Sequence, residues 1–170
     1  ICMKYYKEQG INAVGKLIKE EEQPKHIAAL LAEHRPDIIV ITGHDSMSKE
    51  GKDINSPDRY KNSRFFIEAV KEARKYQHSL DELVIIAGAC QSYYEGILGA
   101  GANFASSPGR ILIHALDPGM ICRQIAFTPI DKVASVEEVM KGTTTGLKGT
   151  GGIQTRGKLR FGMPRSPYIT

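Results

Sequence analysis

Two short apolar stretches of the 170-residue chain each run into a glycine and then present a residue capable of chemistry. His44 follows the stretch Asp37–Gly43, and Cys90 follows Leu83–Gly88 after one alanine. A thiol attacks carbonyl carbon as the thiolate, and a neighbouring imidazole increases the thiolate fraction. The pair therefore predicts nucleophilic catalysis, with the backbone N–H groups of Asp45 and Cys90 as an oxyanion hole.

The stretches before these residues indicate how they are positioned. Short runs rich in Ile and Val, bounded by turn residues, are typical of strands buried on both faces of a parallel sheet. Ligands and reactive groups gather outside the carboxyl ends of such strands. The interval between His44 and Cys90 has room for one loop and one crossover helix. We therefore predict an α/β fold in which two neighbouring strands bring the two residues to one edge.

Hydrophobic spacing and turn residues predict the other elements. Ser135 and Glu138 form a capping box for a helix near 136–141, and Gly10 suits the end of an opening helix. A strand is expected before Cys2, because the chain opens inside a helix. The stretches 45–62 and 142–152 are expected to be irregular loops that help to shape a substrate groove. Further helices are expected near 24–35, 63–77 and 92–99, and strands over 12–18, 38–42, 83–87 and 111–116.

Composition excludes several classes of protein. The chain is 41% hydrophobic and 25% charged, which is typical of one soluble globular domain, and it has no apolar run long enough to cross a bilayer and no signal peptide. A net charge of +4 with scattered basic residues does not predict a nucleic-acid interface. Three irregularly spaced cysteines argue against a disulfide framework and a zinc site. No metal or organic cofactor is expected, and Gly149–Gly152 lacks the ending of a phosphate loop.

Other interpretations of the same residues stay open. Taken singly, Cys90 fits a small buried hydrophobe and His44 a loop histidine, which would make the chain a non-catalytic binding module. A glutamine-amidotransferase-like enzyme would need a histidine downstream of the cysteine, and only His114, in the predicted strand 111–116, is available. Asp117 is either the N-cap of the following helix or an acid that faces the substrate. Cys2 and Cys122 lack a comparable setting and are expected to be structural.

Several blocks of sequence resemble a known family. A strand ending at a histidine and a second ending in Ala-Cys are similar to the caspase, legumain, gingipain and clostripain group of cysteine peptidases. The resemblance is closer to the sporulation-specific cysteine peptidase family (YabG). Its blocks are Ile41-Thr42-Gly43-His44-Asp45, Ala87-Gly88-Ala89-Cys90-Gln91-Ser92, Ala100–Pro108 and His114-Ala115-Leu116-Asp117-Pro118.

This resemblance implies a fold and an activity. The fold would be a caspase-like three-layer α/β/α arrangement with a mainly parallel sheet, and residues 1–170 would form a single peptidase domain that lacks the family's N-terminal region. His44 and Cys90 would be the catalytic dyad. The substrates would be spore coat and related spore proteins, cleaved after basic residues, in the cytoplasm of the sporulating mother cell or in the spore coat.

Two positions depart from the wider group. The residue after the catalytic histidine is usually glycine there, whereas this chain has Asp45, whose carboxylate is expected to orient His44 or to contact a basic substrate. Relatives often carry a specificity residue two positions before the cysteine, where this chain has Gly88. An acid that selects Arg or Lys must therefore come from elsewhere, and Asp117 is the candidate within this sequence.

Overall fold

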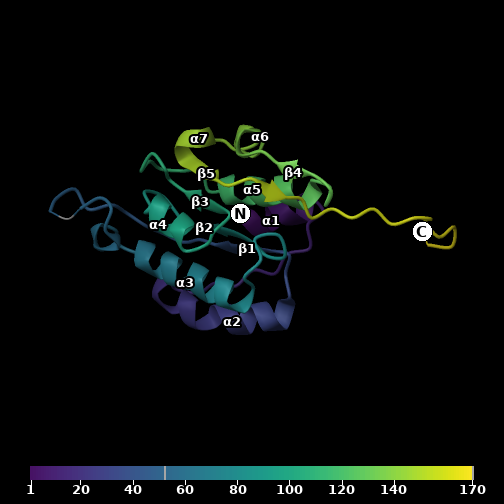
Figure 1. The fold of residues 1–170 in the computed structure, drawn as a ribbon, viewed down its shortest axis with the longest axis horizontal. Helices are drawn as coiled ribbons and strands as arrows, with labels where there is room; N and C mark the ends of the chain where they lie inside the picture. Colours follow the sequence, from purple (N-terminus) through teal and green to yellow (C-terminus); the bar gives the residue numbers. More distant parts are fainter. Residues whose placement is uncertain (52, 170) are drawn as a thin grey trace.

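Helices cover both faces of a central sheet in the computed structural model, which describes residues 1–51 and 53–169 (Figure 1). Lys52, inside the predicted loop 45–62, lies outside the described residues. The helices are α1 (Cys2–Glu8), α2 (Gln23–His34), α3 (Ser63–Tyr76), α4 (Tyr94–Gly99), α5 (Asp117–Phe127), α6 (Val136–Lys141) and α7 (Gly146–Gly149), with 3-10 turns η1 (Glu20–Glu22) and η2 (Pro57–Arg59). The strands are β1 (Ile38–Ile41), β2 (Val84–Ala87), β3 (Phe104–Ser106), β4 (Val133–Ala134), β5 (Thr150–Gly152) and β6 (Thr155–Arg156).

The main sheet is mixed, with mostly parallel strands. Its order is β1-β2-β3-β5; the first three strands run parallel, and β5 pairs antiparallel with β3. β4 and β6 form a separate antiparallel pair. These pairings confirm the predicted α/β class, while the likeness to the caspase group stays a prediction. No helix among the described residues is long and apolar enough to cross a membrane.

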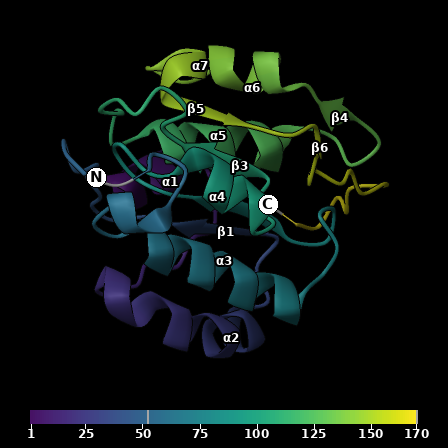
Figure 2. The same ribbon diagram turned by 60° about the vertical axis from the view of Figure 1, so that its left-hand side comes forward.

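Alternating side chains of β2 build a core on each face of the sheet. Ile85 and Ala87 pack with Phe66 in a cluster that includes residues of α2 and α3. Val84 and Ile86 pack in the opposite cluster, which includes residues of α1, α5 and α6. Figures 1 and 2 show α2 and α3 on one side of the sheet and α1 and α5 on the other. Each fully buried aliphatic side chain stabilises the fold by about 1.5–3 kcal/mol, which makes the sheet a firm base for the turns at its edge.

Several predicted helix ends are confirmed. Gly10 has φ of 70° and follows α1, and the chain leaves α2 at Arg35 with φ of 45° before Pro36. The side-chain oxygen of Ser135 accepts a hydrogen bond of 3.2 Å from the N–H of Glu138 at the start of α6. The predicted buried face of α3 is confirmed as well, because Phe66, Ala69, Val70 and Ala73 are all buried.

Three predicted elements were wrong. Residues 111–116 form no strand, because the chain turns just before them through left-handed backbone at Ser107 (φ 67°) and Arg110 (φ 53°). The third parallel strand is instead β3. Residues 12–18 form no strand either. Residues 142–152 contain α7 and β5, and a Cβ at Gly152 would lie 2.2 Å from the carbonyl oxygen of Asn103, so glycine permits this close pairing.

Candidate active site

Parallel pairing of β1 with β2 brings His44 and Cys90 to the same edge of the sheet. Ile41 is the register partner of Ala87, and a hydrogen bond of 3.0 Å from Gly88 N to the carbonyl oxygen of Ile41 extends the pairing. His44 and Cys90 each lie three residues beyond that register pair. Within the described part of the chain no hydrogen bond joins the imidazole to the thiol. Both residues therefore lie at the same edge of the sheet, and their catalytic pairing stays a prediction.

The turn that carries Cys90 has unusual backbone conformations on both sides. Gly88 has φ of 108° and Gln91 has φ of 58°, a region that costs a non-glycine residue about 1–3 kcal/mol. The hydroxyl oxygen of Ser92 accepts a hydrogen bond of 2.9 Å from the N–H of Ala89 and closes the turn. Helix α4 begins at Tyr94, two residues later than the expected start near residue 92 and four residues after Cys90.

Residues of the segment 111–116, which was predicted as a strand, instead support this turn. Gln91 N donates to the carbonyl oxygen of Ile111 at 3.1 Å and to the hydroxyl oxygen of Ser107 at 3.1 Å. The N–H of Ile113 points at the sulfur of Cys90, with a nitrogen–sulfur distance of 3.4 Å. The thiol thus has a fixed backbone neighbour from a distant part of the sequence.

Glu20 contacts His44 on the other side of the site. Its Oε1 atom accepts a hydrogen bond of 2.7 Å from the backbone N–H of His44 and lies 3.3 Å from Nδ1 of the same residue. The imidazole is otherwise open, since the His44 side chain is 96% exposed, whereas that of Glu20 is 21% exposed. A Cβ at Gly43 would lie 2.4 Å from this oxygen, so glycine makes the close approach possible.

The contacts with His44 also change the ionisation of Glu20. Burial by itself would raise the pKa of this carboxyl, but hydrogen bonds from backbone N–H groups, including that of His44, and the imidazole outweigh it and lower the pKa. Sequence reasoning missed this residue. The run Glu20-Glu21-Glu22 signals the start of a helix, and nothing in the spacing reveals which carboxylate faces His44.

Asp45 links the histidine turn to the cysteine turn. Its Oδ1 atom accepts hydrogen bonds from the N–H groups of Ser46 (2.9 Å) and Asn62 (2.8 Å). Its Oδ2 atom accepts hydrogen bonds from the hydroxyls of Ser63 and Ser92. Both oxygens therefore have donors within the chain, which argues against the expectation that this carboxylate orients the imidazole or contacts a substrate.

The backbone around Asp45 leaves the predicted oxyanion donors available. Asn62 Nδ2 donates to the carbonyl oxygen of His44 at 2.7 Å and so holds the histidine turn. Among the described residues, neither the N–H of Asp45 nor that of Cys90 donates a hydrogen bond. Both groups lie at the edge that carries the thiol.

Asp117 lies at the start of α5 and is fully buried, with 0% of its surface exposed. Its Oδ1 atom accepts a hydrogen bond of 2.7 Å from Thr144 N. Its Oδ2 atom accepts hydrogen bonds from His114 N (3.2 Å), Thr145 N and the hydroxyl of Thr145. The carboxylate thus holds the segment before α7 against α5, and this burial argues against its predicted contact with a substrate.

His114 is more accessible than the sequence suggested. It is exposed, and it follows Ile113, which contacts the sulfur of Cys90. Its Nδ1 atom accepts a hydrogen bond of 3.2 Å from the N–H of Leu116. The predicted strand around His114 was wrong, so this histidine and His44 are both tested below.

Aromatic packing anchors the long loop after His44 to the cysteine side of the site. Met47 N donates to the side-chain oxygen of Gln91 at 3.4 Å. The rings of Tyr60 and Tyr93 are stacked with centroids 5.3 Å apart, and the guanidinium of Arg110 donates to the hydroxyl of Tyr60 at 2.8 Å. The loop thus contacts the cysteine turn, and its predicted part in a substrate groove stays a prediction.

The sequence of this site identifies its family. The family model described as YabG peptidase U57 matches residues 1–164. The chain belongs to this family. It is also 50% identical over 163 residues to the sporulation-specific protease YabG of Bacillus subtilis (strain 168), covering 96% of this chain and 56% of that relative. No solved structure matches the chain significantly.

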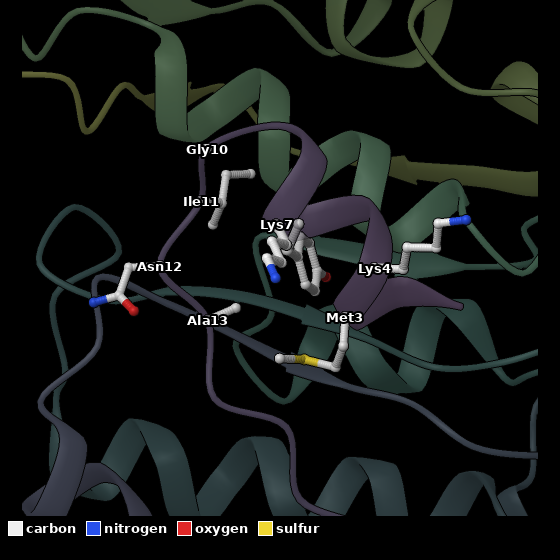
Figure 3. A pocket seen from close by; sticks show the side chains of 8 residues that line it. Met3, Lys4, Lys7, Gly10, Ile11, Asn12 and Ala13 are labelled. Atoms are coloured by element: carbon white, nitrogen blue, oxygen red, sulfur yellow. The ribbon is translucent and has the colours of Figure 1, made fainter.

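The family match spans every residue of the site, whereas one hollow of the molecule lies elsewhere. That hollow, of about 710 Å³, lies between α1 and the residues that follow it (Figure 3). Its lining residues are Met3, Lys4, Tyr6, Lys7, Gly10, Ile11, Asn12 and Ala13. Across residues 1–51 and 53–169, no three His, Cys, Asp or Glu side chains are grouped so as to hold a metal ion.

Proposed function

We propose that this chain is the catalytic part of a cysteine endopeptidase that acts in sporulation, with Cys90 as nucleophile and His44 as its acid–base partner. The observation that carries the proposal is that His44 and Cys90 each lie three residues beyond the register pair Ile41 and Ala87. The chain also belongs to the YabG peptidase family. The chain spans 56% of its curated relative, so the activity of the whole protein forms part of the proposal.

The proposed reaction has two steps. The Cys90 thiol gives its proton to His44 as its sulfur forms a bond to the scissile carbonyl carbon, and the oxyanion accepts hydrogen bonds from the N–H groups of Asp45 and Cys90. The C–N bond then breaks as His44 gives a proton to the leaving amine, which leaves a thioester. Water loses a proton to His44 and its oxygen adds to the thioester carbon. The C–S bond then breaks, the carboxylic acid forms, and the Cys90 sulfur takes the proton back from His44.

The biological assignment rests on family likeness. The relative's name supports a protease of sporulation, and we propose that spore coat and related spore proteins are its substrates. The mother-cell cytoplasm and the spore coat are the corresponding places of action. Cleavage after basic residues rests on the resemblance to clostripain-like peptidases. Because Asp117 is buried, the acid that would select such residues comes from another part of the protein.

Cleavage of fluorogenic peptides ending in Arg, Lys or Asp, with mapping of iodoacetamide labelling, tests the proposal on the full-length protein. The variants are Cys90→Ala, His44→Ala and His114→Ala, and the matched control is His78→Ala, which changes another exposed histidine. We expect loss of cleavage in the first two variants and wild-type cleavage in the others. Labelling of Cys90 near neutral pH should be fast and should slow in His44→Ala.

The same experiment identifies the alternatives. Dependence on His114 instead of His44 would favour the amidotransferase-like arrangement, which the contact between Ile113 and Cys90 keeps open. Slow and equal labelling of all three cysteines, with no peptide cleaved, would overturn the peptidase proposal and favour a binding module.

A further inference from the structure

We propose that Glu20 is the positioning residue of His44 and fixes the tautomer in which Nδ1 carries the proton and Nε2 is the base. The inference deepens the proposed function and rests on it for its catalytic meaning. An ionised carboxylate has no proton to give, so a hydrogen bond between Oε1 and Nδ1 requires the imidazole to donate. The distance is 3.3 Å, and the same oxygen also accepts from the backbone N–H of His44.

Two further features show that this contact is built into the fold. Gly43 leaves room for the carboxylate, because a Cβ there would lie 2.4 Å from Oε1. Buried Gln23, at the start of α2, donates through Nε2 to the carbonyl oxygens of Thr42 (2.9 Å) and Ile18 (3.3 Å). The residues before and after η1 are therefore tied to the histidine turn.

The charged surroundings of Glu20 are simple. Among the described residues, His44 is the titratable side chain that interacts with the Glu20 carboxylate. Helix α3 also packs near η1. The neighbouring Glu21 is exposed and has no recorded contact with the imidazole within residues 1–51 and 53–169. Glu21→Gln is therefore a matched control that removes the same charge from the same turn.

The tautomer is tested directly by nitrogen NMR of the histidine ring in full-length protein, with His44→Ala used for assignment. We expect wild type and Glu21→Gln to show His44 protonated at Nδ1 near neutral pH, and Glu20→Gln to show a shift toward the Nε2-protonated form. An unchanged tautomer in Glu20→Gln would overturn the inference. This measurement needs no enzymatic activity, so its outcome is independent of the peptidase proposal.

Kinetics then test whether the positioning matters. We expect Glu20→Gln to lower kcat/KM by up to about 100-fold, because small displacements of a reacting group have effects of this size. The loss should fall on kcat with KM little changed, because the imidazole acts on the reacting atoms and not on substrate binding. A purely structural role would leave the tautomer in place, and kcat and KM values equal to those of Glu21→Gln would contradict the inference.

Gly43→Ala provides a second, independent variant. The added methyl group should displace the carboxylate while leaving Glu20 in the sequence, so this variant should show the same shift of tautomer. In the double variant with Glu20→Gln, the substitution at Gly43 should cause no additional shift. Additive shifts would mean that glycine at position 43 acts by another route. Loss of cleavage in Cys90→Ala, measured in parallel, keeps the test of the nucleophile separate.

Discussion

Asp45 and Ser92 are joined by a hydrogen bond of 2.9 Å between Oδ2 and the serine hydroxyl, although they lie 47 residues apart in the chain. Each is adjacent to a turn that presents a proposed catalytic residue. The hydroxyl of Ser92 already accepts from Ala89 N, so its proton is directed to Asp45. The carboxylate therefore acts as a fixed link between the histidine and cysteine turns.

Asp45→Asn should weaken this link. An amide presents two N–H donors to groups that are themselves donors, and a buried group left without its partner costs about 1–3 kcal/mol. We expect a loss of this size in the free energy of unfolding, measured by chemical denaturation, together with slower alkylation of Cys90. Asp58→Asn, in an exposed position, is the control. Equal free energies of unfolding for the two variants would show that the hydrogen bonds of Asp45 do not stabilise the fold.

Gly88→Ala should destabilise the cysteine turn. The backbone there has φ of 108°, and a Cβ would lie 3.1 Å from atoms of Ser106 and Ile97. Left-handed strain alone predicts a loss of about 1–3 kcal/mol in the free energy of unfolding. At Gly99, at the end of α4, a Cβ would meet nothing within 4 Å, so Gly99→Ala should leave stability unchanged or raise it by up to about 1 kcal/mol. The opposite ranking would refute this account of the turn.

Glu20 should make stability depend on pH. Its pKa is lowered from the usual 4.5 in the folded protein, so the unfolded chain binds the proton more readily. Its stabilisation is therefore complete above the unfolded pKa and is lost as pH falls through the folded pKa. The gap in unfolding free energy between wild type and Glu20→Gln should be present at pH 7 and shrink as pH falls below 4.5. A gap that stays constant over this range would count against the lowered pKa.

Cys122 should be the least reactive thiol in the native protein. Burial raises its pKa to about 11, although a hydrogen bond with Tyr6 acts in the opposite direction. At pH 8 the thiolate would be roughly one part in a thousand. Iodoacetamide should therefore modify Cys122 only after unfolding, while half-buried Cys2 reacts in the native state. Peptide mapping over time measures both rates, and similar native rates would contradict the prediction.

Local sequence signals predicted the elements that carry the proposed pair. The runs before His44 and Cys90 became β1 and β2 because their Ile and Val side chains are apolar enough to pack between helices. The capping serine at 135 likewise predicted α6. These features depend on residues close together in the chain.

The missed features depend on partners far away. β5 is a Thr-Gly-Gly segment with no intrinsic preference for a strand, and it forms because β3 offers an open edge. The segment 111–116 has an apolar pattern, but it contacts the cysteine turn through Ile111 and Ile113 and forms no strand. The partners of Glu20 and Asp45 come from other turns, so no spacing rule could have paired them.

The position of β5 near the end of the chain has a consequence for the order of assembly. The carbonyl oxygen of Gly149, just before β5, accepts a hydrogen bond of 2.7 Å from Ser107 N, and Ser107 supports Gln91 beside the proposed nucleophile. Proteins are synthesised from the N-terminus at roughly 5–20 residues per second. A nascent chain that has emerged only as far as α6 contains both His44 and Cys90 but lacks this support. Translation itself therefore sets the earliest moment at which the cysteine turn gains this support.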